Sequence, residues 1–192
     1  MDTVTALLLD QLDFYLETHL FPRLEGLGDE EYFWEPAPDC WSVVEGPNGW
    51  ELQHVWPEPD PPPMTTIGWR LAHISASNIG TRANAFFGGS WGHDRFVGAG
   101  VPEGVTFNDP RFTPPIPPTA AEAIAQLHQV SQQWRDGIAG LGDARLLAPI
   151  GPFGGWFAEE PLAALVLHVS RETMHHGGEV GVLRDLFRAA HG

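Results

Sequence analysis

Apolar side chains recur every three or four positions in four stretches of the chain, near residues 3–21, 66–87, 120–139 and 161–190. This spacing places them on one face of an α-helix. Proline and glycine are dense between the stretches, which excludes long helices there. The pattern therefore predicts an all-α fold, a four-helix bundle with long irregular loops. In the last stretch the apolar stripe contains Leu165, Val169, Val180, Leu183 and Phe187.

Local signals mark where several of these helices begin and end. Pro22 follows the first stretch and predicts that its helix ends there. Thr65 or Thr66 is expected to cap the second helix, because a threonine hydroxyl can accept from a free backbone N–H. Thr119 and Glu122 have the spacing of a capping box, which predicts the start of the third helix.

The stretch between residues 26 and 63 is rich in proline and glycine but also in aromatic side chains, including Trp34, Trp41, Trp50 and Trp56. So many aromatics are atypical of a disordered linker. We expect an ordered excursion that covers one end of the bundle. A short hairpin is predicted within it, with arms at 43–45 and 50–55 around the turn Pro47-Asn48-Gly49.

Length and charge narrow the classes of protein to which the chain can belong. The 192 residues suggest one domain, spanning 1–192. The formal net charge is −15, from 10 basic and 25 acidic residues. Phosphate contacts need clustered lysine and arginine, so we expect no binding to nucleic acid or to an anionic membrane surface. The expected partner is a small-molecule substrate.

The N-terminus and the cysteine content indicate a cytoplasmic protein. No segment has the length and apolarity of a membrane span. The leucines at positions 7–9 are flanked by Asp2 and Asp10, without the basic residues of a signal peptide. The single cysteine, Cys40, excludes an internal disulfide and is expected to be a packing residue.

The fourth stretch carries the candidate chemistry. At 100° per residue, Glu172 and His176 fall in the middle of its apolar stripe. A buried carboxylate or imidazole is costly unless it is paired or bound to a metal. His168 precedes them by one further helical turn, so the three form a row along one face. This density of ligand types favours a divalent metal, although the two groups could instead hydrogen-bond each other or a residue on another helix.

Residues around this row are candidates for supporting roles. His168 and His175 are predicted to act beside a metal or as general bases, and Glu179 to orient an imidazole by accepting its N–H. We therefore name His168, His175 and Glu179 as candidate catalytic residues. Solvated surface positions are the alternative for each of them.

Two motifs and the order of the helices resemble the DinB/YfiT-like superfamily of metalloenzymes. The motifs are Gly68-Trp-Arg-Leu-Ala-His73-Ile and His168-x-x-x-Glu172-x-x-x-His176-Gly-Gly-Glu179. Many members carry histidine where this chain has Glu172. A glutamate there resembles the branch of mycothiol-dependent maleylpyruvate isomerases, whose metal site is His, Glu and His. The resemblance implies His73, Glu172 and His176 as metal ligands, an up-down-down-up bundle and a homodimer.

The expected cofactor is a divalent metal, zinc first, with nickel, manganese or iron as alternatives. Three protein ligands would leave a position open, which is typical of a catalytic site. Such a metal would activate water or a low-molecular-weight thiol, and the thiol is implied only by the resemblance. The alternatives are a non-catalytic bundle that binds a metal or ligand, and a bundle in which the histidine and glutamate merely satisfy each other.

Reserve ligands and pocket residues complete these predictions. His168 is the first reserve ligand, and His19, near the end of the first helix, is a weaker one. Small-molecule pockets are mostly apolar, so the aromatic loops are expected to roof the site. The candidate wall residues are Trp41, Trp69, Trp91 and Trp156.

Overall fold

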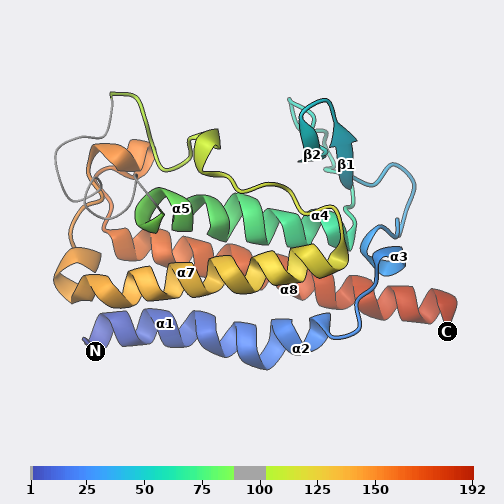
Figure 1. The fold of residues 1–192 in the computed structure, drawn as a ribbon, viewed down its shortest axis with the longest axis horizontal. Coiled ribbons are helices and arrows are strands. Elements are labelled where there is room, and N and C mark those ends of the chain that lie inside the picture. Colours follow the sequence, from blue (N-terminus) through green and yellow to red (C-terminus); the bar gives the residue numbers. More distant parts are fainter. Residues whose placement is uncertain (1, 89–102) are drawn as a thin grey trace.

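The computed structural model describes residues 2–88 and 103–192, and in this part of the chain helices form four rods that lie side by side (Figure 1). The first and fourth rods run in one direction and the second and third in the other. The predicted all-α, up-down-down-up bundle is confirmed. The rods, in chain order, are α1 (Thr3–Tyr15) with the π-helical η1 (Leu16–Leu20) and α2 (Phe21–Leu24); α4 (Ile67–Ala72) with the π-helical η2 (His73–Gly80) and α5 (Thr81–Phe87); α7 (Ala120–Leu146); and α8 (Leu162–His191).

The first rod is longer than predicted. Pro22 directly follows the π-helical η1 in a continuous run of helical backbone, and the helix continues past it to Leu24. The prediction that the helix ends at Pro22 was therefore wrong. The π-helical turn η1 precedes this proline and is the point at which the regular α-helical hydrogen bonding changes.

The predicted caps of the second and third rods are confirmed. Thr66 Oγ1 accepts from the backbone N–H of Trp69 at 3.2 Å, and Thr119 Oγ1 accepts from that of Glu122 at 3.2 Å. The third rod does not end near residue 139 but reaches Leu146. Its helical backbone is interrupted only at Gly142, which has a φ of 74°, a conformation that glycine adopts without a steric penalty.

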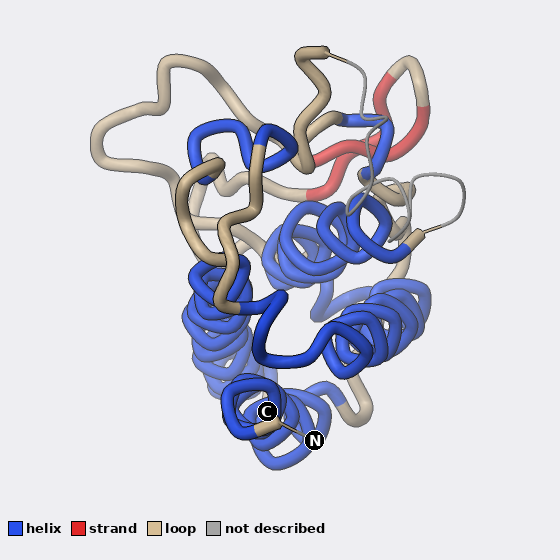
Figure 2. Tube along the Cα trace, turned by 90° about the vertical axis from the view of Figure 1, so that its left-hand side faces the viewer, coloured by secondary structure: helices blue, strands red, loops and turns tan. Residues whose placement is uncertain are grey.

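The loops carry little regular structure. The hairpin is confirmed: β1 (Val43–Gly46) pairs antiparallel with β2 (Gly49–Leu52), joined by Pro47 and Asn48. Among the described residues the loops also contain the short helices α3 (Asp29–Tyr32), η4 (Pro110–Phe112) and η5 (Pro152–Phe157). In Figure 2 the strands and most loops gather on one side of the bundle, above the second rod.

An ion pair ties the far end of α8 to α3. Arg184 donates from Nε and Nη2 to the two carboxylate oxygens of Glu31, at 2.7 and 2.8 Å. Both side chains are buried. This contact holds the last helix, which extends beyond the bundle in Figure 1, against the first excursion of the chain.

None of the helices in the described ranges combines the length and apolarity that a membrane span requires.

Candidate metal centre

His73 is the first residue of η2, on the second rod, and faces the fourth rod. Asn78, further along η2, holds the two rods together: its Nδ2 donates to the backbone oxygen of Val169 at 3.1 Å and to Oγ1 of Thr173 at 3.2 Å. These contacts are buried. They set the rotation of η2 so that the His73 ring lies 4.6 Å, between centroids, from the ring of His176 on α8.

His73, Glu172 and His176 form a group that could hold a divalent metal, since one donor atom from each lies within 4.8 Å of the others. Nε2 of His176 lies 3.4 Å from Oε2 of Glu172. Two ligands that each lie about 2.1 Å from one tetrahedral ion are about 3.4 Å apart. The spacing therefore fits two ligands of a single ion.

Glu172 differs from its predicted environment. It was expected in the middle of the apolar stripe, but its side chain is 35% exposed, whereas that of His176 is buried. The buried face of α8 is centred on Val169, Thr173 and Val180, so Glu172 lies at its border. The group is thus open to solvent on the Glu172 side, which is where a small molecule could approach.

The second nitrogen of His176 is held by a neighbouring carboxylate. Nδ1 lies 2.8 Å from Oε2 of Glu179, and Glu179 also lies 3.0 Å from Nε of Arg70. Burial opposes the shift, but the hydrogen bond to His176 and the charge of Arg70 lower the pKa of Glu179, so it remains a carboxylate. When Nδ1 carries the proton and donates to Glu179, Nε2 has a free lone pair that faces Glu172.

This arrangement would place two lone pairs opposite each other unless a cation lies between them. A proton on Nε2 would also separate them, whereas a neutral imidazole nitrogen and a carboxylate oxygen are both good ligands for a divalent metal. The chemistry of the donor set therefore fits a metal ion between His176 and Glu172.

His73 is neutral at physiological pH. Burial, and then the neighbouring His176, Arg70 and Arg82, lower the pKa of His73 to about 3. The Trp69 ring stacks on it in a nearly parallel orientation, with centroids 5.1 Å apart. A neutral, oriented imidazole is the form that binds a metal.

The three candidate catalytic residues lie in different surroundings. Glu179 contacts His176 directly, as described. His175 is 66% exposed, with Nε2 3.6 Å from Oε1 of Glu179, and these two form a second group of potential metal ligands with His176. His168 is half-buried near the ring of Phe157, and burial lowers the pKa of His168.

The reserve ligands do not join the group. Among the described residues, the donors that converge with His73 and Glu172 do not include His168 or His19. His19 is exposed and contacts the rings of Phe14 and Tyr15. The prediction for His19 was wrong because the π-helical turn that contains it presents this side chain to solvent.

An open cavity of about 680 Å³ lies beside this group. Arg70, His175 and Glu179 form its polar end, next to His176, and the other lining residues are apolar except Thr65. Its lining residues are Pro62, Pro63, Met64, Thr65, Arg70, His175, Gly178, Glu179, Val182, Leu183 and Leu186.

Two of the predicted wall residues lie beside His73, but no described tryptophan is among the residues that line the cavity. Trp69 stacks on His73, and Trp41 packs against Trp69 with ring centroids 6.3 Å apart. Trp156 is fully exposed and lines a different depression, so its assignment was wrong. Trp91 lies outside the described residues.

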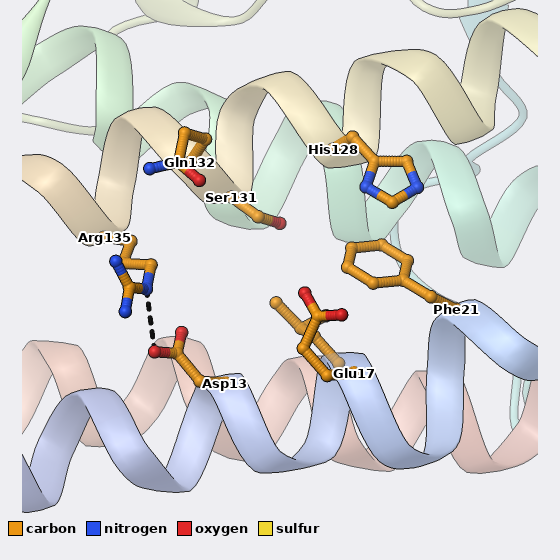
Figure 3. A pocket seen from close by; sticks show the side chains of 8 residues that line it. Asp13, Glu17, Phe21, His128, Ser131, Gln132 and Arg135 are labelled. Atoms are coloured by element: carbon orange, nitrogen blue, oxygen red, sulfur yellow. Dashed lines mark hydrogen bonds and ion pairs between the residues drawn. The ribbon is translucent and has the colours of Figure 1, made fainter.

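A second, more polar pocket of about 240 Å³ lies between the first rod and α7 (Figure 3). Asp13 and Arg135 form an ion pair across it at 2.7 Å, and the rings of Phe21 and His128 stack at 3.9 Å. It contains none of the three converging residues. The candidate metal ligands His73, Glu172 and His176 therefore lie outside this pocket.

The sequence reasoning missed Arg70 and Asn78. Arg70 lies three residues before His73, one helical turn away, and this spacing could have suggested a contact with the candidate site. Asn78 carries no comparable signal, since a single amide in a helix is usually exposed.

Comparison with known proteins gives one result. The family model of the DinB superfamily matches residues 16–180. Neither a curated protein nor a solved structure matches the chain.

Proposed function

Because this chain belongs to the DinB superfamily and brings His73, Glu172 and His176 together, we propose that it is a divalent-metal-dependent enzyme acting on a small molecule. Zinc is the proposed ion. A bound divalent ion lowers the pKa of a thiol or a water molecule and so supplies a nucleophile near neutral pH. The proposed reaction is attack of that nucleophile on a small electrophile, as in a thiol-dependent transferase or isomerase or in a hydrolase.

The observation that carries the proposal is the 3.4 Å approach of His176 Nε2 to Glu172 Oε2, with Nδ1 already committed to Glu179. Three protein ligands are typical of catalytic zinc, whereas structural zinc has four. In this proposal His73, Glu172 and His176 bind the ion, and the exposed side of Glu172 leaves room for substrate.

The remaining residues are assigned roles by their contacts. Glu179 positions His176 by accepting the Nδ1 proton, and Arg70 holds Glu179 in place. His175 lies at the end of the adjoining cavity, where its Nε2 can take a proton from an incoming thiol or water. His168 is the second proposed base, because burial keeps its ring neutral.

Metal analysis followed by activity measurement tests this proposal. Protein purified without added metal should contain about one ion per chain by elemental analysis. His176→Ala should lose both the ion and thiol- or water-dependent turnover on a panel of small electrophiles, while its circular dichroism stays helical. His191→Ala, an exposed histidine at the end of α8, is the matched control and should behave as wild type.

Several outcomes would contradict the proposal. If His176→Ala and wild type turned over every reactive combination of nucleophile and electrophile at equal rates, the metal would have no part in the reaction. A metal without turnover would favour a binding module. A homodimer and a low-molecular-weight thiol cosubstrate remain proposals, to be tested by sedimentation and by comparing thiols with water as nucleophile.

A further inference from the structure

The pocket between the first rod and α7 is lined by two rows of side chains that face each other (Figure 3). Residues on successive helical turns share a face of their helix. On the first rod they are Asp13, Glu17 and Phe21, and on α7 they are Arg135, Ser131 and His128. The two rods run in opposite directions, so the first residue of one row meets the first of the other in the order given.

Contacts between the rods bound the pocket at its two ends (Figure 3). At one end Asp13 Oδ2 accepts from Nε of Arg135 at 2.7 Å. At the other end the rings of Phe21 and His128 stack, with centroids 3.9 Å apart. These contacts have a structural explanation, because they hold the first rod against α7. They leave a space of about 240 Å³ between them, where packed helices would normally have side chains in contact.

In the middle of the pocket the facing side chains do not reach each other. The carboxylate of Glu17 points into the space (Figure 3) and has no ion pair or hydrogen bond with the described residues. Opposite it, Ser131 is only 6% exposed, and its Oγ has no hydrogen-bond partner in the described part of the chain. The neighbouring Gln132 does not supply one, since its Nε2 donates to Oδ1 of Asp136 at 2.8 Å. A buried hydroxyl without a partner indicates that a partner is missing.

The π-helical η1 contains Glu17 and so sets its position in the pocket. Such turns are rare within helices and occur frequently at functional sites. The other π-helical element described above, η2, carries His73 of the candidate metal centre. A π-helical turn therefore contributes a polar side chain to each of the two pockets between helices.

The polar groups in the middle of the pocket match a primary ammonium. An ammonium group has three N–H donors and no acceptor, so it can donate to the carboxylate of Glu17 and to the hydroxyl oxygen opposite. Because the charges of Asp13 and Arg135 compensate each other, the unbalanced charge in the pocket is that of Glu17, and it favours a cation. Leu16 and the ring of Phe21 also line the pocket and can pack against a short alkyl chain.

We propose that this pocket binds a small primary amine, with its ammonium group between Glu17 and Ser131 and its alkyl chain against Phe21. The volume of about 240 Å³ is below the ~300–1,000 Å³ of pockets for drug-sized ligands, so the amine has only a few carbon atoms. The site lies outside the candidate metal centre, and the inference does not rest on the proposed function. Because the amine contacts both rods, its binding stabilises the folded chain.

Isothermal titration calorimetry near neutral pH tests the proposal. The probes are n-butylamine, which is protonated under these conditions, and 1-butanol, which has the same number of non-hydrogen atoms and no charge. Wild type should bind butylammonium about 10–100-fold more tightly than 1-butanol, the contribution of a hydrogen bond to a charged group. Butyrate, an anion of similar size, should bind more weakly than butylammonium. Equal affinities for butylammonium and 1-butanol, tighter binding of butyrate, or no binding of butylammonium would each overturn the proposal.

Variants assign the binding to these side chains. Glu17→Gln should lose the preference for butylammonium over 1-butanol. Ser131→Ala should weaken butylammonium binding by roughly 3–10-fold, while the ligand-free protein stays at least as stable in urea, because the change removes a buried hydroxyl without a partner. Asp10→Asn removes a charge from an exposed position of the first rod outside the pocket and should keep the full preference. An unchanged preference in Glu17→Gln, or unchanged butylammonium binding in Ser131→Ala, would overturn the proposal.

A variant of the metal centre separates this site from the proposed function, because amines can also bind metal ions. His176→Ala should bind butylammonium as wild type does, and Glu17→Gln should take up zinc as wild type does. Butylammonium binding that is lost in His176→Ala but kept in Glu17→Gln would place the amine at the metal centre and overturn the proposal.

Discussion

Replacing Glu179 with alanine should weaken zinc binding without unfolding the protein. In the wild type Glu179 accepts the Nδ1 proton of His176 at 2.8 Å, which leaves Nε2 free for the ion. Without the carboxylate, Arg70 remains with Nη1 3.0 Å from Nδ1 and becomes the donor to that nitrogen. The imidazole proton then moves to Nε2, where it must be lost before zinc can bind.

The expected loss follows from the role of Glu179 as a residue that orients a ligand. Such residues contribute about 10–100-fold to metal affinity, equivalent to about 1.4–2.7 kcal/mol. The assay is competition with a chelator of known affinity at pH 7. Glu159→Ala removes the same charge from an exposed loop position and should bind zinc as wild type does.

A double variant tests the tautomer mechanism itself. Removing Arg70 together with Glu179 takes away the donor that holds Nδ1 unprotonated, so the double variant should recover part of the lost affinity. A Glu179→Ala protein that binds zinc as tightly as wild type would refute the reasoning. A double variant that binds more weakly than Glu179→Ala would refute the role given to Arg70.

Three further predictions concern stability. Glu31→Ala leaves the buried guanidinium of Arg184 without its carboxylate and should lower the free energy of unfolding in urea by about 3–5 kcal/mol; an unchanged midpoint would contradict this. Gly177→Ala places a Cβ 2.3 Å from the hydroxyl of Tyr15 and should lower the free energy of unfolding by about 1–3 kcal/mol. The neighbouring Gly178→Ala meets nothing within 4 Å and should raise the free energy of unfolding by about 0.5–1 kcal/mol. The pKa of His73 is about 3 in the folded chain, against an ordinary value of 6.5. Between those pH values only the unfolded state takes up this proton, so metal-free wild type should lose stability as the pH falls from about 6.5 to about 3. His73→Gln should lose less stability over the same range, measured by urea titrations at pH 4, 5 and 7.

The amino-acid sequence by itself determined the features that depend on residues close together in the chain. The helices at 66–87 and 161–190 follow from apolar residues at helical spacing, and the caps at Thr66 and Thr119 follow from a threonine that precedes a free N–H. The same locality explains the row of Glu172 and His176, since residues four apart on a helix share a face whatever the helix packs against.

Only the tertiary structure decided which faces meet. His73 lies 99 residues before Glu172 in the sequence. Its approach to α8 depends on the rotation that Asn78 and the π-helical η2 impose on the second rod. The spacing of apolar residues shows only roughly which face of a helix is buried. It therefore does not fix the exact rotation of the helix about its axis. For the same reason the exposure of Glu172 emerged only when packing set each helix against its neighbours.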